Sequence, residues 1–249
     1  MSSNYFSDSF SAELYDYWMK ASWQDTDIAF WTQLSPQLGP RVLILGFGTG
    51  RVGLLLAELK HEVVGVEREA AMLEVFSRKK LVEKLRTRIS TVHRDIVALS
   101  ELGTFSAIIA PVWSFDYLIT KEQQKICLVN CYRQLIPEGV LVLNTWIPDV
   151  PEERVAHRQL LFDSPYGRMS REFESYFFEA EPLEARHCTF TIISTGEKRH
   201  YLTVQRHTAP TELSHLLQEN SFLVSGQCDF NYHPWDHLWG NLCTVARKA

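Results

Sequence analysis

The chain has 249 residues, of which 45% are apolar and 22% charged, and it carries a formal net charge of −5. This composition is sufficient for a full hydrophobic core and excludes a disordered chain. The sequence has no basic cluster typical of nucleic-acid binding, no apolar run near the ~20 residues that span a bilayer, and no recognisable secretion signal. Its five cysteines include no CxxC pair, which predicts reduced thiols. We therefore expect a cytoplasmic protein that binds neither nucleic acid nor membrane.

Taken in chain order, the predicted elements begin with residues 1–40, an aromatic-rich segment with a helical pattern that ends between Pro36 and Pro40. From Val42 onward, short apolar runs alternate with amphipathic segments. This alternation predicts an α/β fold with a parallel sheet and helical crossovers. The expected strands are 42–45, 62–67, 88–92, 105–110 and 140–145, and the expected helices are 51–60, 69–81 and 122–136.

Beyond Pro148 the sequence is β-prone without intervening helices, which is typical of antiparallel strands. The expected strands are 170–180, 187–194 and 199–206. We interpret 170–207 as an insertion that is too small to own a core and covers one end of the parallel sheet. A helix at 211–220 and two strands at 222–228 and 238–246 close the predicted chain.

The most informative motif is the glycine loop, which we define as residues 46–50 with the sequence GFGTG. It lies between a predicted buried strand and a predicted helix, where glycines allow positive φ and let a ligand contact the backbone. Glu67 ends the next predicted strand, 21 positions after Gly46. A carboxylate at that strand end can accept hydrogen bonds from both hydroxyls of a ribose. This spacing favours a nucleoside site, with Glu67 facing the loop.

The same glycines allow a second interpretation, because Gly48, Gly50 and Gly53 satisfy the GxGxxG dinucleotide pattern. A nicotinamide-dependent dehydrogenase is therefore an alternative. The alignment of the pattern with the strand argues against this alternative. The first glycine after the strand is Gly46, and a pattern that starts there places Arg51 at the third glycine position, where close helix–strand packing requires glycine.

Several segments together resemble the class I S-adenosylmethionine-dependent methyltransferases. VLILGFGTGRVGLLLAE and HEVVGVE are similar to the first two motifs of that family, and HRDI, APVWSFDYL and LIPEGVLVLNT to later ones, in the family's order. AELYDYW and TKEQQ most resemble the small-molecule N-methyltransferases, including amino-sugar and glycine or sarcosine types. The resemblance implies S-adenosylmethionine as cofactor and a small-molecule acceptor with an amine nitrogen.

The resemblance also implies a Rossmann-like sheet of seven strands, the last antiparallel, in a single domain over 1–249. Residues 1–40 would form a helical lid, and 148–207 an insertion of antiparallel strands covering the substrate site. A non-catalytic cofactor-binding subunit with this fold is a further alternative, and a homodimer is left open.

Because ligands of such sheets bind beyond the carboxyl ends of the strands, we expect one group of residues to contact the cofactor. These are Gly46, Phe47, Gly48, Gly50, Glu67, Arg68, Asp95, Ile96 and Ala110. Tyr15 is expected either to close over the methionine portion, in which case it acts in catalysis, or to be an aromatic residue of an amphipathic helix.

The acceptor pocket is expected to contain Trp113 and Trp146 from strand ends, and Tyr232, His233 and Trp235 from the loop 229–237. His233 is the candidate general base, because an imidazole titrates near neutral pH; a structural or solvated histidine is the alternative. His233 and His237 are spaced like a metal-ligand pair, but they lie on a loop that contains a proline, so no metal is predicted.

Overall fold

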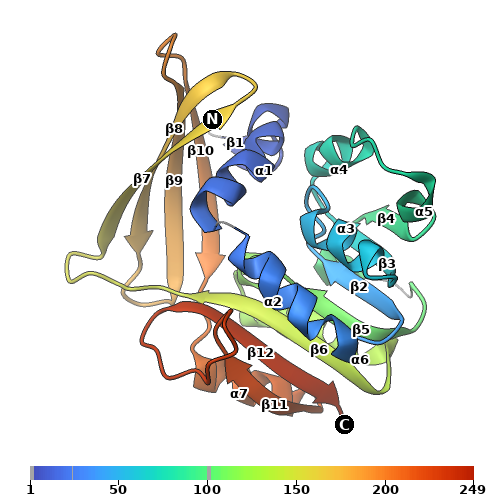
Figure 1. Cartoon of the computed structure of the whole chain (residues 1–249). Helices are drawn as coiled ribbons and strands as arrows, with labels where there is room; N and C mark the ends of the chain where they lie inside the picture. Colours follow the sequence, from blue (N-terminus) through green and yellow to red (C-terminus); the bar gives the residue numbers. More distant parts are fainter. Residues whose placement is uncertain (1–2, 24, 100–101) are drawn as a thin grey trace.

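The computed structural model describes residues 3–23, 25–99 and 102–249, which form two sheets with a helix between them (Figure 1). The larger sheet has seven strands in the order β11-β12-β6-β5-β2-β3-β4. The smaller has five strands in the order β1-β10-β9-β8-β7. Residues 1–2 and 24 of the predicted N-terminal lid lie outside the described part of the chain.

The seven-stranded sheet confirms the predicted Rossmann-like architecture. Its strands are β2 (Arg41–Leu45), β3 (Glu62–Glu67), β4 (Ile89–His93), β5 (Phe105–Ala110), β6 (Leu135–Ile147), β11 (Phe222–Cys228) and β12 (Gly240–Lys248). Neighbouring strands from β4 to β6 are parallel, whereas β12, the last strand of the chain, is antiparallel to β6 and β11.

Helices cover both faces of this sheet, which explains its continuous apolar strands. Val42 and Ile44 of β2 belong to one core cluster, while Leu43 and Leu45 belong to the other. The first cluster lies under α2 (Thr26–Leu34) and α3 (Arg51–Glu58), and the second under α6 (Lys121–Gln134) and α7 (Pro210–Glu219). The remaining helices are α1 (Ser9–Trp23), α4 (Ala70–Ser77), α5 (Glu83–Arg86) and three short 3₁₀ helices at Ser35–Gln37, Ile96–Ala98 and Ser114–Tyr117.

The boundary between α6 and β6 differs from its prediction. The helix ends at Gln134, and β6 begins at Leu135 without an intervening turn. Residues 137–139, which were expected to lie between the helix and the strand, instead form an irregular stretch of β6, where Glu138 has a φ of 59° and the register with β5 shifts.

The strands expected within residues 170–207 belong to a five-stranded sheet that obtains its core by packing on α1. Its strands are β1 (Ser3–Asn4), β7 (Val155–Ser164), β8 (Gly167–Phe177), β9 (Leu183–Ile192) and β10 (Lys198–Arg206), and β7 was not predicted. The sheet packs against α1 through Phe10, Leu14 and Trp18, which lie four residues apart on one helix face. Sheet and helix thus share a hydrophobic core that neither could form alone.

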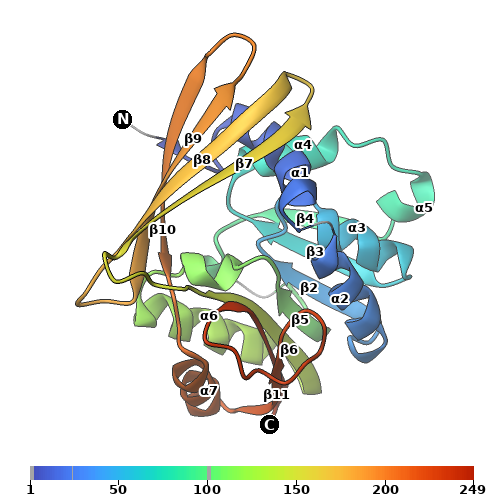
Figure 2. The same cartoon turned by 60° about the vertical axis from the view of Figure 1, so that its left-hand side comes forward.

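Helix α1 joins the two sheets, because it contacts β7 on one side and α4 on the other (Figures 1 and 2). Asp16 of this helix accepts a hydrogen bond from Thr49 of the glycine loop, and its second oxygen lies 2.6 Å from the ammonium of Lys79, which follows α4. The expectation that residues 1–40 act as a lid over the site stays a prediction.

The ring of Phe47 fills the space between α3 and β3. A Cβ atom on Gly53 would lie 2.3 Å from this ring, and one on Gly65 would lie 2.1 Å from it. The ring also contacts Phe76 edge to face, at 4.8 Å between centroids. Gly53, the last glycine of the dinucleotide pattern, is therefore required for this packing.

We expect Gly65→Ala to lower the free energy of unfolding by about 1–3 kcal/mol, because the added methyl group overpacks the Phe47 ring. Adding Phe47→Leu should recover part of that loss. Urea denaturation of the single and double variants measures this coupling. Gly226→Ala is the control, since a Cβ there meets nothing within 4 Å. Equal, near-neutral effects at positions 65 and 226 would contradict the packing described.

Candidate functional site

The glycine loop turns sharply at the carboxyl end of β2. Gly46, Gly48 and Gly50 have φ values of 73°, 59° and 85°, which L-residues with a side chain rarely adopt. The N–H groups of Gly46 and Phe47 both donate to the carbonyl of Val66 at 2.9 Å. The loop is therefore held against the end of β3 by its backbone.

The carboxylate of Glu67 completes this attachment. One oxygen accepts hydrogen bonds from the N–H groups of Arg68 at 2.8 Å and Glu69 at 2.9 Å, and the other accepts from Gly48 at 2.8 Å. The residue is only 9% exposed. Burial raises the pKa of this carboxyl, and the three N–H groups oppose that rise. The oxygen that faces Gly48 retains capacity for a further hydrogen bond.

A cavity of about 90 Å³ opens beside this carboxylate, and we call it the loop cavity. Of the predicted site residues, it is lined by Tyr15, Gly46, Gly48, Glu67, Arg68, Asp95 and Ile96. Arg68 reaches across toward Asp95, with 3.7 Å between its guanidinium and the carboxylate. The structure thus brings together residues from the ends of β2, β3 and β4, as the strand-end rule predicts.

Three predicted cofactor contacts do not line the loop cavity. The Phe47 side chain packs between α3 and β3 instead, so only its backbone faces the turn, and its contact with the cofactor stays a prediction. Gly50 precedes α3, and its N–H donates to the carbonyl of Phe47. Ala110 is fully buried within β5, and the cavity wall is formed by Val112 and Ser114, which follow it.

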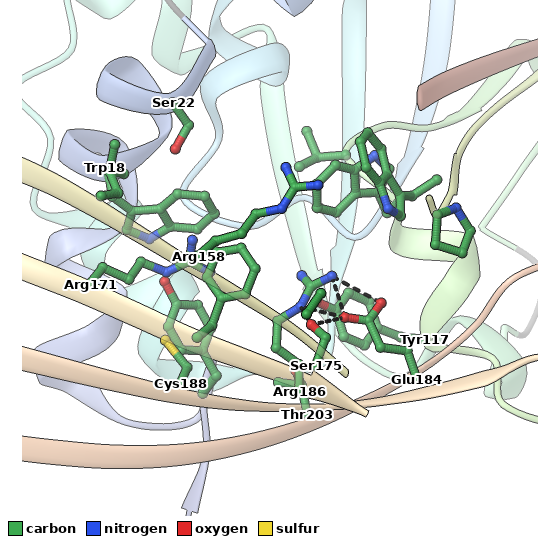
Figure 3. Close-up of a pocket in the computed structure, with 18 of the residues that line it drawn as sticks. Trp18, Ser22, Tyr117, Arg158, Arg171, Ser175, Glu184, Arg186, Cys188 and Thr203 are labelled. Carbon is green, nitrogen blue, oxygen red and sulfur yellow. Dashed lines mark hydrogen bonds and ion pairs between the residues drawn. The ribbon is translucent and has the colours of Figure 1, made fainter. Parts of the chain in front are cut away.

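A second cavity, of about 310 Å³, lies between the two sheets, and we call it the sheet cavity (Figure 3). Trp113 and Trp146 line it as predicted, with their ring centroids 5.1 Å apart. The opposite wall is the inner face of the five-stranded sheet, on which every second residue points toward α1. That wall carries Leu160, Arg171, Phe173, Ser175, Glu184, Arg186, Cys188 and Thr203.

The two cavities share four wall residues, Phe6, Tyr15, Val112 and Tyr117. Tyr15 extends from α1 into this shared wall, and its predicted action on the methionine portion stays a prediction. Burial raises the pKa of both Tyr15 and Tyr117 far above the ordinary value, so their hydroxyls stay neutral. Molecules bound in the two cavities would meet at this shared wall.

The loop 229–237 does not contribute to either cavity, which corrects the predicted acceptor pocket. Tyr232 stacks on Phe30 and donates its hydroxyl hydrogen to the carbonyl of that residue at 2.7 Å. The imidazole of His233 is largely exposed and lies 3.3 Å from Asp229. Trp235 packs against the core of the larger sheet. The loop connects β11 to β12 at the expected edge, but Tyr232 holds it on α2, and none of its residues lines either cavity.

His233 is therefore not placed to act as a base on an acceptor. His237 also lies near Asp229, at 3.7 Å. Within the part of the chain that the structure describes, no group of three or more metal-ligating side chains is arranged to hold a metal ion.

A buried charged cluster on β8 and β9 was missed in the sequence. The guanidinium of Arg186 lies 2.8 Å from the carboxylate of Glu184, which also contacts Ser175 and lies 2.8 Å from the imidazole of His207. Burial by itself raises the pKa of Glu184, but His207 and Arg186 lower it to about 2. The sequence feature that could have predicted this cluster is the alternation along β9, which places charged residues on the same face of the strand as apolar ones.

Comparisons with known proteins agree with this architecture. Residues 42–139 match the family described as Methyltransferase domain. The protein YqeM of Bacillus subtilis (strain 168), which carries the name of a methyltransferase, is 30% identical over 131 residues, 52% of this chain and 48% of its own length. This chain thus matches about half the length of that relative.

Two solved structures share the fold. The CcbJ methyltransferase from Streptomyces caelestis has a TM-score of 0.86 and 20% identity, with 99% of this chain and 98% of that one covered. CalS10 from Micromonospora echinaspora, an amino pentose methyltransferase, has a TM-score of 0.68 and 18% identity, with 91% and 90% covered.

None of the helices in the described part of the chain has the length and apolar character needed to span a membrane. Residues 42–139 thus match the methyltransferase domain family, and the chain as a whole shares its fold with the CcbJ methyltransferase.

Proposed function

We propose that this protein transfers the methyl group of S-adenosylmethionine to the amine nitrogen of a small molecule. The observation that carries the proposal is the shared wall of the two cavities. The loop cavity has the glycines and the acid suited to a nucleoside, and the sheet cavity has room for a second molecule on the other side of Tyr15.

The loop cavity supports the cofactor assignment. Glu67 lies at the end of β3 with an oxygen that can accept from a ribose hydroxyl, and the glycine loop brings backbone close to the ligand without Cβ atoms. Asp95 and Ile96, which are among the expected cofactor contacts, line the same cavity. CalS10, which shares the fold, was solved with S-adenosylmethionine bound.

The sheet cavity supports a small acceptor. Its aromatic walls, including Trp18, Trp113 and Trp146, can hold a cationic or planar molecule by its faces. CalS10 is described as a methyltransferase of an amino pentose, which favours an amine as the nucleophile here.

The reaction requires little acid–base catalysis by the protein, because the sulfonium of the cofactor supplies an activated methyl group. The chain must align the acceptor with that methyl group and exclude water, which can lower the barrier by roughly 7 kcal/mol or more. Among the described residues, no histidine lines the sheet cavity, and the low pKa of Glu184 makes it a weak base. The amine is therefore expected to lose its proton on desolvation.

Replacing Glu67 with alanine tests the cofactor site. The variant loses a hydrogen bond to a charged acceptor, so S-adenosylhomocysteine should bind about 10- to 150-fold more weakly, a loss of about 1.5–3 kcal/mol. Isothermal titration calorimetry measures this affinity. Glu62→Gln, at the exposed opposite end of β3, should bind as the unaltered protein does. Equal affinities in all three proteins would mean that the ribose is held elsewhere.

The affinity should also depend on pH through the same residue. Burial raises the pKa of Glu67, and cofactor binding favours its ionised form, so binding should weaken as the pH falls through that raised pKa. Above it, binding should be constant. Titrations from about pH 8 down to the ordinary glutamate pKa of about 4.3 cover the expected change. Glu67→Gln should remove this pH dependence of the affinity. If the variant keeps the same pH dependence, the titrating group is the neighbouring Glu69 or Asp95.

A methyl-transfer assay separates the alternatives. We expect label from methyl-labelled S-adenosylmethionine to appear on at least one member of a panel of small amines that includes amino sugars and amino acids. Binding of the cofactor without transfer to any member would favour the non-catalytic subunit. Enhanced fluorescence of NADH, without binding of S-adenosylmethionine, would favour the dehydrogenase.

A further inference from the structure

We propose that Arg171 forms an anion-binding subsite in the sheet cavity, and that the methyl acceptor is an amine that also carries a carboxylate. This inference rests on the proposed function, because it names the chemical class of the molecule that fills the same cavity.

Arg171 lies on the inner face of β8, directly below α1 (Figure 3). It is only 8% exposed. Its guanidinium carbon lies 4.1 Å from the ring centroid of Trp18, 5.0 Å from that of Phe173 and 5.6 Å from that of Tyr5. These aromatic faces hold the guanidinium plane in place and partly stabilise its charge.

The charge of Arg171 has no counterion in the described part of the chain. None of the ion pairs within 4.0 Å involves it, whereas its neighbour Arg186 is paired with Glu184. The thiol of Cys188 is a hydrogen-bond partner, but burial raises the pKa of that thiol, so it stays neutral. Burial likewise raises the pKa of the nearby Tyr5 hydroxyl. No neighbouring group therefore compensates the positive charge.

Three buried donors of the same cavity lack hydrogen-bond partners within the described structure. They are the Nε of Arg171, the indole Nε1 of Trp18 and the hydroxyl of Tyr5. All three residues line the sheet cavity. Buried donors without acceptors and a buried unpaired charge are both costly. One anionic ligand group would satisfy the charge and supply acceptors at the same place.

A carboxylate is the group that fits best. The planar guanidinium fork matches a carboxylate in two parallel hydrogen bonds. The charge balance of the cavity agrees: apart from the exposed Arg158 and Asp149, it is lined by two arginines, Arg171 and Arg186, and by one carboxylate, Glu184. An uncharged acceptor would leave the positive charge of Arg171 without a counterion and would also displace water from around it.

The test uses two probes of nearly the same shape, phenylacetate and phenylacetamide, which differ in charge and carry the aromatic ring that the cavity walls favour. Each is titrated calorimetrically into protein saturated with S-adenosylhomocysteine. We expect the carboxylate to bind at least about 10-fold more tightly than the amide. Arg171→Gln should abolish this preference and leave the affinity for S-adenosylhomocysteine unchanged.

Arg168→Gln is the matched control, because Arg168 lies on the same strand but is half exposed, pairs with Asp163 and does not line the cavity. It should keep the full preference. If Arg171→Gln does not fold, Arg171→Lys decides the question, since an ammonium group without the planar fork should reduce the preference several-fold.

Equal binding of both probes, binding of neither, or a preference that persists in the Arg171 variants would overturn the subsite. These outcomes are distinct from failure of the proposed function, which would show first as absence of S-adenosylhomocysteine binding to the unaltered protein.

Discussion

The fold of the site depends on one carboxylate that accepts hydrogen bonds from three backbone N–H groups. Glu67 fixes the glycine loop to the end of β3 through Gly48 and orders the turn that follows through Arg68 and Glu69. Burying that carboxylate is costly, and these N–H groups offset the cost. As a result, the loop after β2, the start of α4 and the wall of the loop cavity are held in one arrangement.

Helix α1 extends this arrangement to the second sheet. One face packs Phe10, Leu14 and Trp18 onto the antiparallel strands, while Asp16 contacts the glycine loop through Thr49. Tyr15, between these contacts, lies on the wall that both cavities share. The same packing therefore stabilises the small sheet and determines where a cofactor and an acceptor would meet.

The sequence predicted best what depends on neighbouring residues. The apolar run at 42–45, the glycine spacing and the position of Glu67 follow from local backbone requirements, and the structure places them as expected. The direction of the Phe47 ring could not be predicted in this way, because it depends on how α3 packs on β3, which leaves space for the ring at Gly53 and Gly65. The strand β7 was missed because its exposed and half-buried positions lack a clear alternation.

The acceptor side was predicted least well, for a related reason. Arg171, Glu184 and Arg186 are charged residues whose burial depends on the pairing of three strands and on α1 above them. The histidines of the loop 229–237 have favourable chemistry, but Tyr232 holds that loop on α2, and none of its residues lines the cavity. Residue type thus predicted the kind of chemistry, while only the sheet order showed which residues come together.

A crystal structure with S-adenosylmethionine bound tests the central claim most directly. The account predicts that the ribose hydroxyls lie within hydrogen-bonding distance of the Glu67 carboxylate, and that the sulfonium methyl group points past Tyr15 and Tyr117 into the sheet cavity. A nucleoside bound away from the glycine loop, or a methyl group directed away from that cavity, would contradict it.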